Sequence, residues 1–228
     1  MDDYSSPAPI SGDQLPRAVI FDMDGVLLYS EPFIEQAITQ MFSEKGLAIY
    51  KEDFIPFVGT GEGFCIKGIA AQYGFSLDVE GAKKEAYRIY YRLIRDNLKA
   101  LPGAFDFIDK CRGLGKKLAI ASSADMEKVR ANSRAVGLDL GLFDAIVTGE
   151  LVTNKKPSPD LFLLAAEKMG VEGSECLVIE DAINGIAAAH RAGSRCLALT
   201  TSFTADELID AEWVTADLTA VDPQVLKW

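Results

Sequence analysis

The residues that could perform chemistry stand in four short stretches, at or just beyond the ends of apolar runs. They are Asp22 and Asp24, Ser122 and Ser123, Lys156, and Glu180 and Asp181. Apolar runs of four or five residues are typical of strands that are buried on both faces of a parallel sheet. Ligand sites in such sheets lie beyond the carboxyl ends of the strands. We therefore expect these four carboxylates, hydroxyl groups and an ammonium group to meet at one edge of a sheet.

This combination of groups favours phosphoryl transfer assisted by a metal ion. Clustered carboxylates repel one another unless a cation lies between them, and a site made of oxygen atoms favours Mg²⁺. Asp22 and Asp24 could divide the work, one attacking while the other transfers a proton. A hydroxyl group and the Lys156 ammonium suit the oxygens of a phosphoryl group. Each stretch alone is weak support, because acid pairs at turns usually cap the backbone and a Lys before Pro is usually a surface residue. The prediction of phosphoryl transfer depends on all four stretches occurring together, in this order along the chain.

Alternating strands and helices would position these residues. The apolar run 18–21 predicts a first strand, and further strands are expected at 118–121, 145–148, 177–180, 196–199 and 213–215. Helical periodicity lies between most of them, at 104–112, 126–136, 160–169, 185–192 and 205–209. Strands that alternate with helices form a parallel sheet covered on both faces. The sequence thus predicts an α/β fold with a Rossmann-like parallel-sheet core.

The stretch between residues 28 and 100 differs, because it shows helical patterns and no convincing strand. Helices are expected from about residue 30 to 46, from 62 to 73 and from 81 to 98. We interpret residues 28–100 as a helical bundle inserted as a cap, and 17–27 with 101–228 as the core. Residues 1–16 are expected to form a disordered lead-in. The hinges of the cap would lie near 27–31 and 99–103.

Composition narrows the classes of partner. The chain has 228 residues, 23 Lys plus Arg and 34 Asp plus Glu, and a formal net charge of −11. This balance argues against nucleic acid and anionic membranes as partners, since both are bound through fields of Lys and Arg. No apolar run has the length of a membrane helix, and the acidic first residues do not resemble a signal peptide. We expect a cytoplasmic protein, with an organelle stroma left open, and a monomer as the default.

The few cysteine and histidine residues offer little further chemistry. The four cysteines form no Cys-x-x-Cys pair, so that buried, reduced thiols are the favoured interpretation. The single histidine, His190, lies in an alanine-rich helical stretch and is interpreted as a surface or packing residue rather than a base.

The ordered motifs resemble a known family. Phe21-Asp22-Met23-Asp24-Gly25-Val26, Ala121-Ser122-Ser123-Ala124, Lys156-Pro157-Ser158-Pro159-Asp160 and Ile179-Glu180-Asp181 together resemble the four-motif signature of the haloacid dehalogenase-like (HAD) hydrolases. The helical insert directly after the first motif resembles the cap of the β-phosphoglucomutase-like subgroup. The resemblance extends from Ala18 to the C-terminus.

The resemblance implies a role for each matching residue. Asp22 would be the nucleophile that forms an aspartyl-phosphate, and Asp24 the acid and base that protonates the leaving oxygen and then activates water. Gly25, Ser122, Ser123 and Lys156 would surround the phosphoryl group, with Lys156 also steadying Asp22. Mg²⁺ would be bound by the carboxylates of Asp22 and Asp181 and the backbone carbonyl of Asp24, with Glu180 as a direct or more distant ligand.

Two positions favour hydrolysis of a small phosphomonoester, such as a sugar phosphate or a nucleotide-like metabolite. The related sugar phosphomutases hold a second phosphate with cationic groups, whereas this chain has Glu62 and Asp125 at the matching positions. Glu62, in the glycine loop 59–63, would instead contact the leaving group. A β-phosphoglucomutase-type phosphomutase and a regulatory, non-metabolic HAD module are the alternatives. The latter would be expected to lack one of the motif residues, and all of them are present.

Overall fold

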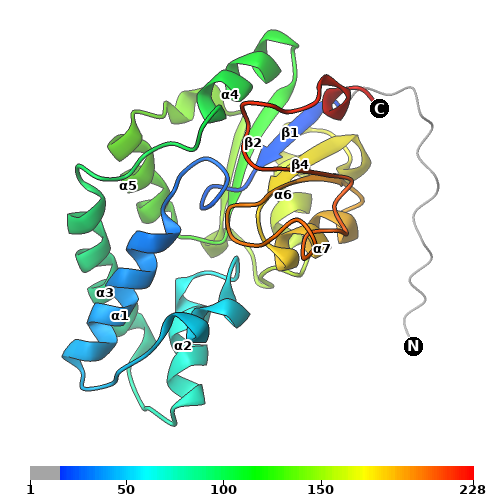
Figure 1. The fold of residues 1–228 in the computed structure, drawn as a ribbon. Helices are drawn as coiled ribbons and strands as arrows, with labels where there is room; N and C mark the ends of the chain where they lie inside the picture. Colours follow the sequence, from blue (N-terminus) through cyan, green and yellow to red (C-terminus); the bar gives the residue numbers. More distant parts are fainter. Residues whose placement is uncertain (1–15) are drawn as a thin grey trace, which may run out of the picture.

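A six-stranded parallel sheet organises the molecule (Figure 1). The structure is a computed structural model and describes residues 16–228. The strands lie in the order β3-β2-β1-β4-β5-β6, so β1, which leads to Asp22, is flanked by β2 and β4. Because β1 pairs with β2 and β4 in parallel, the ends of all three strands reach the same edge of the sheet.

The sheet follows the predicted pattern of apolar runs. Its strands are β1 (Ala18–Phe21), β2 (Lys117–Ser122), β3 (Ala145–Thr148), β4 (Cys176–Glu180), β5 (Arg195–Leu199) and β6 (Trp213–Thr215). Every residue of β1 and β4 is buried, as expected for strands covered on both faces. The helices of the core are α4 (Ala104–Gly113), α5 (Met126–Val136), α6 (Asp160–Met169) and α7 (Ile183–Arg191). The prediction of a Rossmann-like α/β fold is therefore confirmed.

Alternate strand residues supply two apolar layers, one on each face of the sheet. Val19 and Phe21 pack on one face with buried residues of α4 and α5 and of the C-terminal segment. Ala18 and Ile20 pack on the other face, against α6 and α7. This alternation follows from the period of two in a strand. Packing on both faces fixes the position of each strand, and therefore the position of the residues directly after its end.

A group of helices that follows β1 and precedes β2 in the chain lies beside the sheet in Figure 1. It contains α1 (Glu31–Glu44), the 3₁₀ segment η1 (Lys51–Phe57), α2 (Glu62–Gln72) and α3 (Val79–Ile94). Helix α1 begins with Pro32 in its first turn and buries Ile34, Ile38 and Met41 at helical spacing. It packs closely on α3. We call this group the helical insert.

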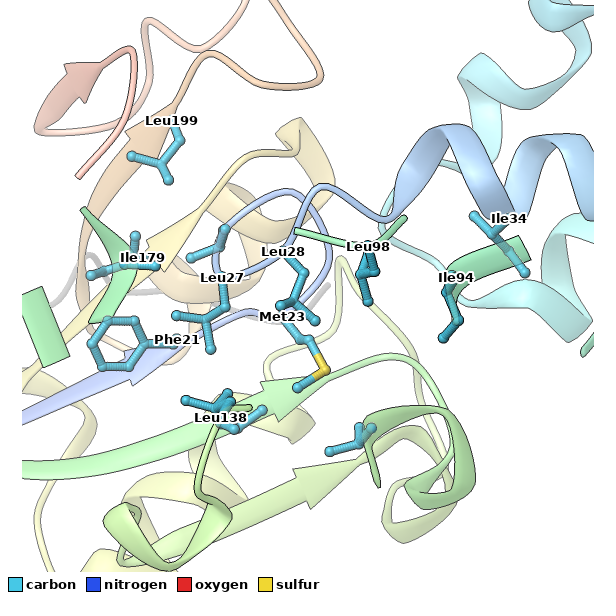
Figure 2. Packing of buried hydrophobic residues seen from close by; sticks show 14 of the residues in the cluster. Phe21, Met23, Leu27, Leu28, Ile34, Ile94, Leu98, Leu138, Ile179 and Leu199 are labelled. Atoms are coloured by element: carbon cyan, nitrogen blue, oxygen red, sulfur yellow. The ribbon is translucent and has the colours of Figure 1, made fainter. Parts of the chain in front are cut away.

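The two chain segments that join the insert to the core run side by side. The Tyr29 amide donates to the Lys99 carbonyl over 3.1 Å, and the Leu101 amide donates to the Leu27 carbonyl over 2.9 Å. Figure 2 shows Leu28 and Leu98 between side chains near the sheet, such as Phe21, and those of the insert, such as Ile34. One apolar cluster thus continues from the sheet into the insert.

The structure differs from the predicted elements in a few places. The expected helix at 205–209 is wrong: residues 205–210 form turns. The Glu207 side chain accepts hydrogen bonds from the amide and hydroxyl of Thr204. Leu208 is the one buried residue in the stretch 205–210, so a helix there would have no apolar face to pack and stabilise it. Segment η1 was not predicted, and α3 ends at Ile94 rather than near residue 98. The predicted lead-in lies outside the described residues except for Pro16.

Candidate active site

A buried lysine joins two strand ends at the centre of the sheet edge. The Lys156 ammonium donates to Asp22 Oδ1 over 2.5 Å and also to Glu180 Oε1. The Lys156 side chain is 0 % exposed, and those of Asp22 and Glu180 are 9 % and 0 % exposed. Since Asp22 follows β1 and Glu180 ends the neighbouring β4, the parallel pairing of these strands brings the two carboxylates to one ammonium.

The Glu180 carboxylate is fully engaged with the protein. Its Oε2 accepts the backbone amides of Asp181 and Ala182 over 2.9 and 3.0 Å, just before α7 begins, while Oε1 accepts from Lys156. A Cβ atom on Gly185 would lie 1.9 Å from the Glu180 carboxyl carbon, so the carboxylate needs a glycine at that position in α7. This geometry fits Glu180 as the residue that holds Lys156.

Burial governs the protonation of this cluster. It raises the pKa of Asp22 to about 7, with Lys156 opposing the rise and Glu180 adding to it. Burial alone would lower the pKa of Lys156, but Asp22 and Glu180 outweigh it and the pKa is raised. Lys156 is therefore a permanent cation beside a carboxyl group that titrates near neutrality.

Asp181 lies against the turn that follows β1. A Cβ atom on Gly25 would lie 1.9 Å from Asp181 Oδ2, so that only glycine allows this approach. The same oxygen accepts hydrogen bonds from the hydroxyls of Thr201, over 3.2 Å, and Ser202. Burial, together with Glu180 and Asp22, raises the pKa of Asp181 well above its usual value.

These donors fit a hydrated Mg²⁺ ion. Within residues 16–228, no three carboxylate, thiol or imidazole side chains gather closely enough to bind a metal ion by themselves. Mg²⁺ commonly keeps several water ligands and takes only one or two carboxylates from the protein. Burial disfavours the ionised forms of Asp22 and Asp181, and the charge of Asp22 adds to this effect on Asp181. A divalent cation would stabilise the two ionised carboxylates.

A second buried lysine holds the other carboxylate of the first motif. Lys128, on α5, donates to Asp24 Oδ2 over 2.8 Å and is 1 % exposed. Asp24 Oδ1 accepts hydrogen bonds from the Ser30 hydroxyl and, over 3.3 Å, from the Asn132 amide. Both carboxylate oxygens of Asp24 are thus held by named partners.

The helical insert reaches Asp24 through the same lysine. Glu62, the first residue of α2, accepts from Lys128 over 2.6 Å at Oε1 and from the Tyr87 hydroxyl over 2.9 Å at Oε2. Burial by itself would raise the pKa of Glu62, but Lys128 outweighs it and the pKa is lowered. The structure thus places Glu62 at the site, although its carboxylate is bound to protein groups.

A cleft opens between the sheet edge and the insert. The core lines it with Asp22, Asp24, Ser122, Ser123 and Asp181. From the insert it is lined by apolar side chains and three acids: Ile34, Ile38, Phe54, Phe57, Val58, Cys65, Glu31, Glu35 and Glu62.

The two serines at the end of β2 occupy different places. Ser122 is 1 % exposed and its hydroxyl accepts the Ala124 amide over 3.1 Å. The Ser123 hydroxyl donates to the Gly59 carbonyl over 2.8 Å, which joins the core to the glycine loop of the insert. A Cβ atom on Gly61 would lie 2.9 Å from the Ser123 carbonyl oxygen, so that the loop can approach this closely only with glycine there.

Three residues of this site were not predicted from the sequence: Lys128, Asn132 and Glu31. A signal for the first two was present, because Lys128 and Asn132 lie four residues apart on the face of α5 that also buries Val129. A lysine and an amide on the inward face of a helix need polar partners. Glu31 lines the cleft, and burial and the nearby Asp24 raise its pKa to about 8.

The histidine and the cysteines form no part of the ion pairs described above. His190 is half-exposed and pairs with Glu212 at the far end of α7, away from the cleft. All four cysteines are free and buried. Every helix within residues 16–228 falls short of the length and apolar content that crossing a membrane requires.

The fold and the site define a class of protein: an α/β protein with a Rossmann-like parallel sheet and a helical insert over an acid-rich sheet edge. A family model described as haloacid dehalogenase-like hydrolase matches residues 16–193, and the chain belongs to this family. The predicted family is thereby confirmed, and solved β-phosphoglucomutases share the fold, in agreement with the predicted subgroup.

Relatives with curated names include phosphatases. The chain is 34 % identical over 180 residues to the phosphorylated carbohydrates phosphatase of Thermotoga maritima, covering 78 % of this chain and 82 % of that protein. The match to the protein SUPPRESSOR OF QUENCHING 1, chloroplastic, of Arabidopsis thaliana is 44 % identical over 200 residues. It covers 85 % of this chain but only 19 % of the plant protein's length. The family and the phosphatase names confirm the prediction of an enzyme of the phosphatase class.

A solved structure with the same architecture is CbbY from Rhodobacter sphaeroides in complex with phosphate. The two chains are 25 % identical, with a TM-score of 0.81, and the match covers 93 % of this chain and 99 % of CbbY. The likeness therefore includes both the sheet and the helical insert.

Proposed function

We propose that this chain is a Mg²⁺-dependent phosphatase that hydrolyses a small phosphomonoester through an aspartyl-phosphate on Asp22. The observation that carries the proposal is the buried Lys156, which donates to Asp22 Oδ1 at the floor of the cleft. The ammonium fixes one carboxylate oxygen and leaves Oδ2 to attack. It also supplies positive charge where the phosphoryl oxygens would gather.

Two steps would complete the reaction. In the first, Asp22 Oδ2 forms a bond to phosphorus while the bond from phosphorus to the leaving oxygen breaks, and Asp24 gives that oxygen a proton. In the second, water attacks phosphorus, Asp24 takes its proton, and the bond to Asp22 breaks to release inorganic phosphate. Asp24 suits both steps because it lines the cleft together with Asp22 and is held by Lys128, Ser30 and Asn132.

Other groups of the strand ends would bind the phosphoryl group. We assign Ser122 and Ser123 to its oxygens, since both line the cleft beside Asp22, and Gly25 to the tight turn past it. Mg²⁺ would be held by Asp22, Asp181 and the Asp24 backbone carbonyl, with Glu180 acting through Lys156 rather than as a direct ligand. When bound, the ion would neutralise charge on the transferring phosphoryl group.

The lining of the cleft supports a leaving group without a second phosphate. Glu31 and Glu35 face it from α1, beside apolar side chains. Two lysines at the junction of insert and core are already paired with carboxylates, Lys128 with Glu62 and Lys83 with Asp125 at 2.5 Å. A phosphorylated polyol or sugar fits this lining, and the carbohydrate phosphatase among the relatives agrees with that class.

Residues 28–100 would act as the cap, with the core formed by 17–27 and 101–228. The paired connections around Leu28 and Ala100 support this division, because the insert joins the core at one narrow place. Closure over the cleft would exclude all but the attacking water.

Phosphate release from a panel of sugar and nucleotide monophosphates, measured with Mg²⁺ and with EDTA, tests the proposal. We expect Mg²⁺-dependent release from at least one of them and its loss in Asp22→Asn. No release from any ester, or full release by Asp22→Asn, would overturn the proposal. Conversion of a hexose 1-phosphate to its 6-phosphate with a bisphosphate activator would instead establish the mutase alternative.

A further inference from the structure

Lys128 is unusual because its charge is buried between two parts of the molecule. Its ammonium, on core helix α5, lies 2.8 Å from Asp24 Oδ2 and 2.6 Å from Glu62 Oε1 of the insert. It also lies 5.3 Å from the centre of the Tyr90 ring on α3. With 1 % of the side chain exposed, the charge is compensated by protein groups rather than by water.

A second chain of hydrogen bonds links the insert to Asp24, from α3 through α5. The Tyr90 hydroxyl of α3 donates to Asn132 Oδ1 over 2.7 Å, and Asn132 Nδ2 donates to Asp24 Oδ1 over 3.3 Å. Lys128 and Asn132 lie one helical turn apart on α5, so that each holds one oxygen of the same carboxylate. From the insert, Glu62 and Tyr90 thus hold the polar side chains of α5, and Tyr87 in turn holds Glu62.

We propose that Lys128 is a positioning residue for Asp24, and that Glu62 of the insert holds Lys128 in place for this task. The inference rests on the proposed function, because it assigns Asp24 to proton transfer. It extends that function by naming the groups that orient the carboxylate and by making its orientation depend on the packing of the insert. Glu62 is thereby assigned to Lys128 rather than to the substrate.

Position matters here because proton transfer requires hydrogen-bond geometry at the leaving oxygen. Without the ammonium, the Asp24 and Glu62 carboxylates would face each other in a buried space and repel. Asp24 would keep Ser30 and Asn132 on Oδ1 but lose its partner on Oδ2. Rotation of the carboxylate by such a loss is the kind of misplacement that costs about 10²-fold in rate.

The test compares two esters in Lys128→Met. An alkyl monophosphate accepted by the unchanged protein needs a proton on its leaving oxygen, whereas p-nitrophenolate leaves without one. We expect kcat/KM to fall about 10²-fold for the alkyl ester and by less than about tenfold for p-nitrophenyl phosphate. Equal losses on both esters would contradict the inference.

A double variant separates positioning from folding. Lys128→Met with Glu62→Gln restores the net charge of the original three groups, so that thermal stability should recover towards that of the unchanged protein. The unequal loss on the two esters should remain, since Asp24 still lacks its partner. Recovery of the alkyl-ester rate together with stability would show that Lys128 serves the fold alone and would overturn the inference.

Lys83→Met is the matched control. Lys83 on α3 pairs with Asp125, directly before α5, and so also joins insert to core, but Asp24 is not among its partners. This variant should change both esters equally; a selective loss on the alkyl ester would contradict a role specific to Lys128. If the unchanged protein hydrolyses neither ester nor any of the panel, the proposed function fails, and the inference fails with it. Turnover of the unchanged protein with equal losses in Lys128→Met sinks the inference alone.

Discussion

The candidate active site has two buried lysines with different surroundings. Lys156 is enclosed within the core, between Asp22 and Glu180 at the ends of adjacent strands. Lys128 lies between Asp24 of the core and Glu62 of the helical insert. The first cluster lies wholly within the core, on two neighbouring strand ends and the turn before α6, whereas the second exists only when core and insert are packed together. Under the proposed function, the half that contains the nucleophile is the rigid half, and the half that transfers the proton depends on the insert.

The largest effect is expected from Asp22→Asn in the rigid half. The amide cannot form the acyl phosphate, so kcat should fall on the order of 10³-fold or more. Release of inorganic phosphate from the best ester of the panel measures it. Circular dichroism should remain that of the unchanged protein. Activity within tenfold of the original would mean that Asp22 is not the attacking group.

Lys156→Met should cause the greatest loss of stability. It leaves Asp22 and Glu180 buried without their cation, and breaking a buried pair of this kind costs about 3–5 kcal/mol. Urea unfolding followed by fluorescence measures the change in the free energy of unfolding. Lys155→Met is the control. The Lys155 ammonium donates to the Gly149 carbonyl and the residue is only half-buried, so a small change in the free energy of unfolding is expected. Equal changes in both variants would contradict a special role for Lys156.

Binding of Mg²⁺ should depend on pH through the rigid half. The pKa of Asp22 is about 7 in the protein without metal, and a ligand must be ionised, so protons compete with the ion below that pH. Affinity measured by calorimetry should rise about tenfold from pH 6 to pH 8. The Lys128→Met, Glu62→Gln double variant should keep this dependence. A dependence lost in that variant would place the metal in the other half.

The same pKa has a consequence for stability. Because the pKa of Asp22 in the folded protein lies above the ordinary value of 3.8, its protonation stabilises the fold. That contribution is complete below about pH 4 and is lost as pH rises through about 7. The melting temperature without metal should therefore fall between pH 6 and pH 8, and saturating Mg²⁺ should reverse the fall. A fall that persists with Mg²⁺ would have another origin.

His190→Ala should have the smallest effect, since the residue lies outside both halves. Its hydrogen bond to Glu212 raises the pKa of His190 above 6.5, so any stabilisation is present below that pH and is lost as pH rises through the raised pKa. The pair is more than a third exposed, and a change within about 0.5 kcal/mol is expected by urea unfolding. A loss of turnover in this variant would contradict its placement away from the chemistry.

The two halves also differ in how well the sequence predicts them. Asp22, Lys156, Glu180 and Asp181 stand at or near strand ends, and apolar runs mark strands clearly, so their meeting followed from parallel pairing. Lys128 was missed because its partners Glu62 and Asp24 are 66 and 104 residues away, and Glu62 reaches it only through the packing of the insert on α5. No local pattern specifies which helix of the insert faces α5.

Direct detection of a phosphoryl group on Asp22 tests the central claim. The protein is mixed with Mg²⁺ and its best ester, quenched in acid within one turnover, and digested for mass spectrometry. We predict that the peptide containing Asp22 gains the mass of one phosphoryl group in the unchanged protein and gains none in Asp22→Asn. Turnover with no modified peptide at any time, or a phosphoryl group on another residue, would contradict the account.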